Sequence, residues 1–181
     1  MQRIVLTFGL ISGAILAMMM LITMPFHETL MEAGTGEVVG YTTMVVAFLL
    51  VYFGVRSYRD NVAGGSVSFG RAFAVGMSIM AVGSACYVAT WEVIYYSSNT
   101  GNEYIAKYQE HQVGKLRARG ASQAEIDTKT AEMQKFAELY KNPVVNSAIT
   151  FLEPLPVGLV MALISAGVLR RRRDDEALAT A

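Results

Sequence analysis

Two carboxylates lie inside apolar stretches of the sequence, where charged residues are otherwise absent. Glu92 stands near the end of the stretch 73–96, and Glu153 stands in the stretch 144–169. An ionisable side chain in the hydrocarbon of a bilayer is costly, about 2.5–3.5 kcal/mol for charged residues at a helix centre, and usually faces a partner or a water-filled cavity. Glu92 and Glu153 are therefore the two positions that best indicate a function.

A polar site near the outer ends of the membrane spans would bring both carboxylates together with several neighbours. The members of this candidate intramembrane site are Glu92, Glu153, His27, Glu28, Trp91 and Tyr95. Carboxylates held close together can share a proton, because repulsion raises the pKa of at least one, and with an imidazole they can bind a divalent metal. Three simpler interpretations stay open. Glu92 reaches the headgroups, Glu153 stabilises a bend in its helix, and His27 is an interfacial residue.

Prolines directly after Glu153 predict a helix break. Pro154 and Pro156 each lack an N–H group and leave an upstream carbonyl without its helical partner. Gly158 follows them and completes the predicted break. Irregular backbone at membrane depth is tolerated where protein buries it or water reaches it.

The familiar motifs of catalysis and cofactor binding are missing from the sequence. It contains no G-x-S-x-G, C-x-x-C or H-E-x-x-H pattern, and its glycine-rich segment 63–71 lacks the residue order of a phosphate-binding loop. The single cysteine, Cys86, permits no disulfide within the chain. We therefore predict no catalytic residue, no metal and no cofactor, and we favour a protein that is not an enzyme.

Membrane-spanning helices are needed to position these side chains. The apolar stretches predict spans of about 4–25, 38–55, 73–96 and 144–169, near the roughly 20 residues that cross about 30 Å of hydrocarbon as a helix. The first stretch also resembles a signal peptide, but it is longer than the usual apolar region and no Ala-x-Ala site follows it. The predicted fold is all-α, with four transmembrane helices in one membrane domain, residues 1–181.

Basic residues in the short connections predict that both termini lie in the cytoplasm. These topology anchors are Arg56, Arg59, Arg71, Arg170, Arg171, Arg172 and Arg173. The connection 26–37 holds three glutamates and no Lys or Arg, and is expected outside. Residues 170–181 would form a basic and then acidic cytoplasmic tail. The formal net charge of zero gives no drive toward nucleic acid, so none is expected as a partner.

The segment 97–143 is too long for a bare turn and should have structure of its own. A helix is expected from Glu103 to Arg119, ended by Gly120. Ser122 and Glu125 have the spacing of a capping box that starts a second helix, which would reach Tyr140. The prediction is an extracytoplasmic helical hairpin between spans three and four, with its apolar stripes packed on each other, on the span ends or on a partner.

Four sequence strings occur in an order that resembles a known family. They are SFGRAFAVG at 68–76, YVATWE at 87–92, AEMQ at 131–134 and FLEPLPVGL at 151–159. With the four-span layout, they resemble bacterial membrane proteins of the domain of unknown function 4199 family over nearly the whole chain. This resemblance implies a bacterial multi-pass membrane protein, and it implies no activity. We expect the protein in the bacterial inner membrane.

Three hypotheses about function follow. The leading one is a non-enzymatic structural or interaction component, whose partners beyond the lipid bilayer are a second copy of the chain or another membrane protein that meets the 97–143 segment. The alternative is an oligomeric proton- or ion-linked carrier that uses Glu153 and Glu92. A membrane enzyme with a glutamate as acid or base rests on the carboxylates alone.

Overall fold

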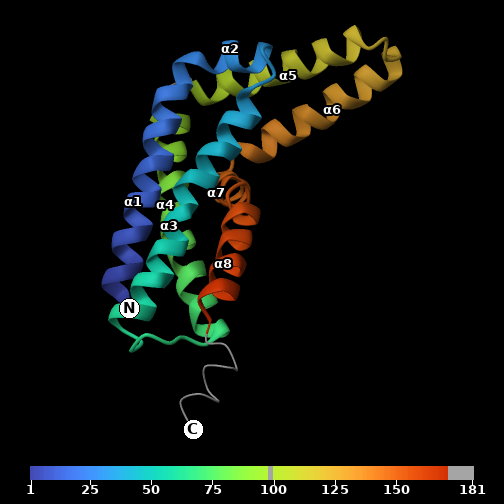
Figure 1. The fold of residues 1–181 in the computed structure, drawn as a ribbon. Coiled ribbons are helices and arrows are strands. Elements are labelled where there is room, and N and C mark those ends of the chain that lie inside the picture. The colour runs from blue at the N-terminus through green and yellow to red at the C-terminus, as the bar shows by residue number, and fades with distance from the viewer. Residues whose placement is uncertain (98–99, 171–181) are drawn as a thin grey trace.

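The protein is a bundle of long helices from which a pair of helices extends at one end (Figure 1). The computed structural model describes residues 1–97 and 100–170, which are mostly helical, with no strand among them. The elements are α1 (Gln2–Thr23), the short 3-10 helix η1 (Met24–Phe26), α2 (His27–Glu32), α3 (Gly36–Asn61), α4 (Phe69–Ser97), α5 (Thr100–Ala118), α6 (Gln123–Tyr140), α7 (Pro143–Leu152) and α8 (Leu155–Leu169). The all-α prediction is confirmed.

Three helical segments are long and apolar enough to cross a membrane, namely Gln2–Glu32, Gly36–Asn61 and Phe69–Ser97. These segments contain the first three predicted spans. Each segment is longer than its predicted span, because the helix continues into the polar residues on either side. The pair α7 and α8 passes the same test only when taken together, and its two parts are bent by 41°. The described residues therefore hold three candidate spans, or four if the bent pair is one span.

Helix α1 approaches α4 closely along a face of small residues. A Cβ atom at Gly9 would lie 2.6 Å from Cβ of Val82, and one at Gly13 would lie 2.5 Å from Cβ of Cys86. Glycine permits such close contact between membrane helices because no side chain intervenes. The G-x-x-x-G spacing in α1 therefore serves packing within the chain.

The core of the bundle lies where α3, α4 and α8 meet. Phe48, Val51, Ile79 and Met80 are almost completely buried there. Gly76 of α4 packs against Ala162 of α8, so small residues again allow the two helices to lie close together.

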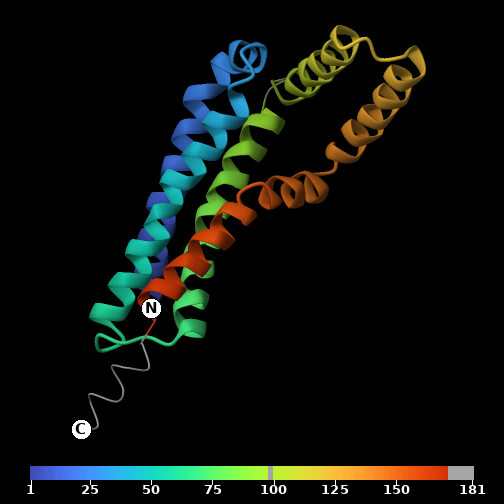
Figure 2. The same cartoon turned by 45° about the vertical axis from the view of Figure 1, so that its right-hand side comes forward.

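The fourth apolar stretch is divided at Glu153 and Pro154. α7 ends at Leu152, and α8 starts with a hydrogen bond of 2.9 Å from Gly158 N to the carbonyl oxygen of Pro154. Because Pro154 and Pro156 have no N–H group, neither can continue the hydrogen-bond ladder of α7. The bend turns α7 away from the line of α8 (Figure 2).

Helices α5 and α6 meet at their turn, run in opposite directions and separate toward the bundle, beyond which they extend (Figure 2). Gly120 has a φ of +75° in the turn between them, a conformation that glycine adopts without strain. The hydroxyl of Ser122 accepts a hydrogen bond of 3.3 Å from the N–H of Glu125, which is one half of a capping box. The Glu125 side chain instead pairs with Arg119 across the turn.

Candidate functional site

Glu153 lies at the break between α7 and α8, opposite α4. The hydroxyl of Tyr87, on α4, donates a hydrogen bond of 2.8 Å to Oε2 of Glu153. The carboxylate is exposed at the surface of the described chain, and no Lys, Arg or His within residues 1–97 and 100–170 forms an ion pair with it. A carboxylate without a cation therefore faces outward from the break.

Two tyrosines outside the bundle lie within the electric field of this carboxylate. Burial, and then the negative charge of Glu153, raise the pKa of Tyr104 on α5. Burial raises the pKa of Tyr140 on α6 to about 12, with Glu153 adding to the rise and the hydrogen bond to Thr150 opposing it. Among the described residues, the phenol with a hydrogen bond to Glu153 is that of Tyr87.

An aromatic cluster joins the C-terminal end of α4 to α5 and α6. Its ring centroids lie 5.9 Å apart for Trp91 and Tyr95, 5.5 Å for Trp91 and Tyr104, and 5.6 Å for Tyr95 and Tyr140. His27 extends the cluster through a 5.5 Å contact with Tyr104. Tilted and edge-to-face pairs at these separations are stabilising, so the base of the α5–α6 pair is packed against the bundle.

A buried polar network lies beside the aromatic cluster. The indole N–H of Trp91 donates to Oδ1 of Asn146 at 3.0 Å, and the hydroxyl of Thr150 donates to the same oxygen at 3.2 Å. The Tyr140 and Thr150 hydroxyls are 3.0 Å apart, and the Asn146 amide donates to the Tyr140 carbonyl. Asn146 is 0% exposed and Thr150 is 2% exposed. A satisfied buried network of this kind holds its helices in one arrangement.

Glu92 has a different partner from Glu153. The hydroxyl of Ser147, on α7, donates to Oε1 of Glu92 at 2.8 Å. Two consecutive residues of α4 therefore bind two consecutive residues of α7: Trp91 binds Asn146, and Glu92 binds Ser147. The contact of Glu92 fastens α7 to α4, whereas the contact of Glu153 lies at the break.

His27 and Glu28 also have partners of their own. Nδ1 of His27 lies 2.8 Å from the carbonyl oxygen of Met24. Glu28 forms an ion pair with Lys107 of α5, and its carboxylate raises the pKa of Lys107. His27, Glu28, Glu92 and Glu153 are thus held by four separate sets of contacts.

The described residues contain no group of three or more His, Cys, Asp or Glu that could hold a metal ion. The basic residues near the other end of the bundle are partly paired, since Arg56 and Arg59 lie 3.7 Å and 2.7 Å from oxygens of Asp60. Arg71 is near the start of α4 and Arg170 follows α8. Arg171, Arg172 and Arg173, and the tail after them, lie outside the described residues.

Sequence reasoning missed several residues of this region. Tyr87 was not predicted, although it precedes the predicted Trp91 and Tyr95 at intervals of four residues, which places all three along one side of a helix. Asn146 and Thr150 have the same interval inside an apolar stretch. Both four-residue spacings can be seen in the sequence. Neither spacing indicates which other helix the aromatic or polar side of its own helix contacts.

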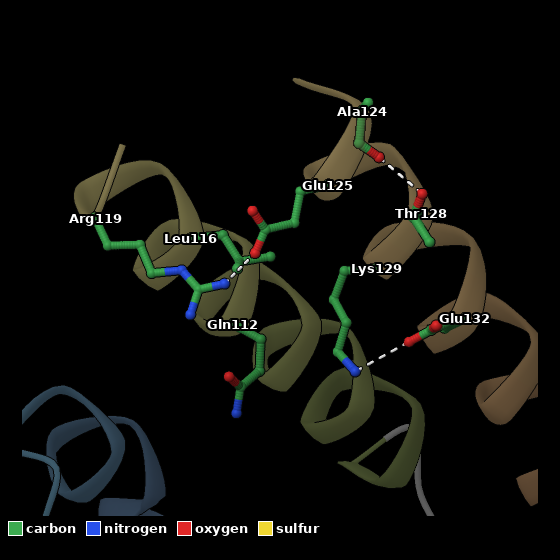
Figure 3. A pocket seen from close by; sticks show the side chains of 8 residues that line it. All are labelled: Gln112, Leu116, Arg119, Ala124, Glu125, Thr128, Lys129 and Glu132. Carbon is green, nitrogen blue, oxygen red and sulfur yellow. Dashed lines mark hydrogen bonds and ion pairs between the residues drawn. The ribbon is translucent and has the colours of Figure 1, made fainter. Parts of the chain in front are cut away.

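A pocket of about 660 Å³ lies between α5 and α6 close to their turn (Figure 3). Its charged lining residues pair with one another, Arg119 with Glu125 and Lys129 with Glu132. Leu116 supplies part of its apolar floor. The charged residues that line the pocket are therefore all paired, and none of them offers an unpaired charge to a ligand.

Comparison with known proteins gives one result. The family model described as "Protein of unknown function (DUF4199)" matches residues 7–171. No curated protein and no solved structure matches the chain.

Proposed function

We propose that this chain, which belongs to the DUF4199 family, is a four-span protein of the bacterial inner membrane that acts as a non-enzymatic interaction component. The main support for this proposal is a buried hydrogen-bond network formed by Trp91, Asn146, Thr150 and Tyr140. The network holds the base of the α5–α6 pair against the bundle. A pair of helices held in a fixed position outside the membrane is suited to contact with a partner.

The pattern of exposure supports α7 and α8 as one broken span. Val144 and Leu152 of α7 are 78% and 58% exposed, while Asn146 and Thr150 on the same helix are buried. In α8, Val160, Ile164 and Val168 face outward. Apolar side chains outside and polar ones inside are the arrangement expected in lipid, where the backbone and polar groups must find partners within the protein.

The position of the chain ends supports an even number of spans. The start of α1 and the end of α8 lie at one end of the bundle, and α5 and α6 lie at the other (Figure 1). At the end that holds the start of α1, the short connection between α3 and α4 and the helix ends beside it carry Arg56, Arg59 and Arg71, whereas the connection 26–37 carries no Lys or Arg. The positive-inside rule favours the cytoplasm for the arginine-bearing end. We place α5 and α6 outside the cytoplasm.

Cysteine labelling tests this orientation, because Cys86→Ala removes the single native thiol. In that background, Lys129→Cys on α6 should react with a membrane-impermeant maleimide in intact cells. The matched variant Ser66→Cys, in the connection before α4, should react only after permeabilisation. Labelling of Ser66→Cys in intact cells would contradict the proposed topology.

A second copy of the chain is the partner we propose for α6. Phe136 and Leu139 lie three residues apart on one side of α6, and Leu139 is 61% exposed although the helix lies outside the proposed membrane region. Acidic and basic residues alternate along α5 and α6. A two-fold contact between copies can therefore cover the apolar side chains and pair opposite charges.

Crosslinking in native membranes tests this partner. In the Cys86→Ala background, oxidation of Leu139→Cys should give a disulfide-linked dimer. Gln134→Cys, which is exposed on another side of α6, is the matched control and should give much less dimer. Equal yields from both positions, or a monomer in both, would refute a specific contact between copies.

A proton- or ion-linked carrier is the second candidate function. It is favoured by the exposed Glu153 at the break in the fourth apolar stretch, because discontinuous helices form binding sites in many transporters. In proteoliposomes, Glu153→Gln should abolish a cation- or proton-dependent flux that the unchanged protein shows. A lack of flux in the unchanged protein would dismiss this candidate.

A further inference from the structure

The α5–α6 pair is attached to the rest of the chain at two places, and the attachment of α6 to α7 is buried. The Tyr140 hydroxyl lies 3.0 Å from that of Thr150, and the Asn146 amide donates to the Tyr140 carbonyl oxygen. Tyr140, Thr150 and Asn146 are 5%, 2% and 0% exposed. Separation of α6 from α7 would leave buried polar groups without partners, which costs more free energy than the loss of an exposed contact.

The attachment of α5 to α2 is exposed by comparison. Lys107 forms an ion pair with Glu28, and the two side chains are 44% and 53% exposed. His27 adds a contact with Tyr104, with ring centroids 5.5 Å apart. Ion pairs between exposed side chains contribute little to stability, because water and salt screen the two charges. The contact between α2 and α5 is therefore the weaker of the two attachments.

Buried polar atoms without partners also gather on the α5 side. Among the side chains that the structure describes, four nitrogen or oxygen atoms are buried without a hydrogen-bond partner. Three of them are the Nε2 atoms of His27 on α2 and of Gln109 and His111 on α5, and none belongs to α6 or α7. Burial of such an atom is unfavourable. Movement of α5 away from α2 would let water reach Nε2 of His27.

The first turn of α5 can act as a pivot because Gly101 has no side chain. A Cβ atom there would lie 2.3 Å from Cδ2 of Tyr95, so the backbone of α5 lies directly against that ring. Trp91 adds an edge-to-face contact with Tyr104, with ring centroids 5.5 Å apart. These contacts hold the start of α5 against α4, whereas Lys107 lies farther along the helix.

We propose that the contact between α2 and α5 is a latch, which opens while the contact between α6 and α7 stays closed. On opening, α5 rotates about its first turn, Lys107 moves away from Glu28, and the ring of His27 becomes accessible to water. The latch is a movement within one chain and goes beyond the proposed contact between copies.

Distances between spin labels on the full chain in lipid nanodiscs test the latch in the Cys86→Ala background. One pair of labels reports on α2 and α5, at Ala33→Cys and Lys115→Cys. A second pair reports on α6 and α7, at Lys135→Cys and Ala148→Cys. All four positions are exposed. Dilution with unlabelled chain removes distances between copies, so the latch and the proposed contact between copies can fail separately.

Lys107→Ala should at least double the population at longer distance for the α2–α5 label pair and leave the α6–α7 pair unchanged. An increase in sodium chloride from about 0.1 M to about 1 M should do the same without that substitution, because the Debye length falls from about 10 Å to about 3 Å. Glu28→Lys combined with Lys107→Glu restores a pair of opposite charges and should restore the shorter distance.

Lys129→Ala is the matched control for the loss of a lysine. It removes an exposed ion pair with Glu132, which lies within α6, and should change neither label pair. The unchanged distances of the α6–α7 pair also report that each variant is folded.

Three results would overturn the proposal. The first is an α2–α5 distance distribution that stays the same in Lys107→Ala and in high salt. The second is equal broadening for both label pairs, since α5 and α6 would then move together. The third is a charge-swapped variant that behaves as Lys107→Ala does, because the ion pair would then not be what holds α5.

Discussion

The indole N–H of Trp91 on α4 lies 3.0 Å from Oδ1 of Asn146 on α7 and donates a hydrogen bond to it across 55 positions of sequence. Both side chains are buried, and the Asn146 oxygen also accepts from Thr150. This contact determines where α7 lies against α4. It thereby determines the direction in which the polypeptide leaves the bundle toward α6.

Asn146→Leu should destabilise the protein although it removes no side-chain volume. The change keeps a side chain of similar size but leaves the Trp91 N–H and the Thr150 hydroxyl without their acceptor, at a cost of about 1–3 kcal/mol for a buried unsatisfied group. Thermal unfolding in detergent measures the effect. Ser147→Ala, which removes the half-buried bond to Glu92, is the control and should cost less. A milder effect of Asn146→Leu than of Ser147→Ala would contradict this account of the network.

Gly13→Ala should be destabilising although alanine is the better helix former. The new Cβ would meet Cβ of Cys86 at 2.5 Å, and overpacking in a packed interior costs about 1–3 kcal/mol. Gly40→Ala on α3, where the new atom meets nothing within 4 Å, is the matched control and should be neutral or stabilising.

A double variant identifies the clash of Gly13→Ala directly. Cys86→Gly removes the atom that the new Cβ meets, so the double variant should be more stable than the sum of the two single changes predicts. If the stability changes of the two single variants simply add in the double variant, then the new Cβ at position 13 does not clash with residue 86. The measurement is again the midpoint of thermal unfolding.

Protein stability should fall as the pH rises from about 10 to about 12. The pKa of Tyr140 is raised from 10.0 to about 12 in the folded protein, chiefly by burial. The unfolded chain loses this proton first, so the stabilisation is complete below pH 10 and is lost as the pH approaches 12. Melting temperatures across this range should show the decline.

Tyr140→Phe isolates the contribution of that one phenol. The variant should be less stable at neutral pH, because the contact with the Thr150 hydroxyl is lost, but its stability should decline less between pH 10 and pH 12. Subtracting the tyrosinate absorbance of the variant from that of the unchanged protein isolates the titration of Tyr140. This titration should occur above pH 10. A titration at pH 10 would mean that Tyr140 is not desolvated.

Replacement of both prolines after Glu153 should straighten the broken helix. Pro154→Ala with Pro156→Ala restores two N–H donors to the ladder, so α7 should align better with α8 than the present 41° bend allows. Spin labels at Val144→Cys and Val168→Cys, both outward-facing positions, in the Cys86→Ala background would report a longer separation. An unchanged distance distribution would mean that contacts with α4, and not the prolines, hold the bend.

Local sequence signals stand at several of the helix boundaries. Gly120 and Ser122 mark the turn between α5 and α6, and Asn142 and Pro143 mark the start of α7, because glycine, capping side chains and proline act on the few residues around them. The expected helix start at Glu103 was late by three residues, since α5 begins at Thr100. Capping interactions at helix ends are weak individually, so such boundaries shift easily.

The placement of the candidate site residues was harder to predict. Glu92 and Glu153 were expected at the outer end of neighbouring spans; Glu92 lies near the end of α4, and Glu153 lies at the break between α7 and α8. Their partners, Ser147 and Tyr87, were not identified. Each helix can rotate about its axis without changing its own hydrogen bonds, and a local pattern does not determine that rotation.

The sequence alone determined that this chain is helical and has apolar stretches of the length that a bilayer requires, because an unpaired backbone in lipid is too costly for any open structure. It also determined the site of the break, since proline removes a donor wherever it stands. Only the tertiary structure decided that Asn146 binds Trp91, that Glu153 binds Tyr87, and that the small residues of α1 face α4. Those contacts depend on how whole helices rotate and cross, which is settled by the joint packing of side chains from distant parts of the chain.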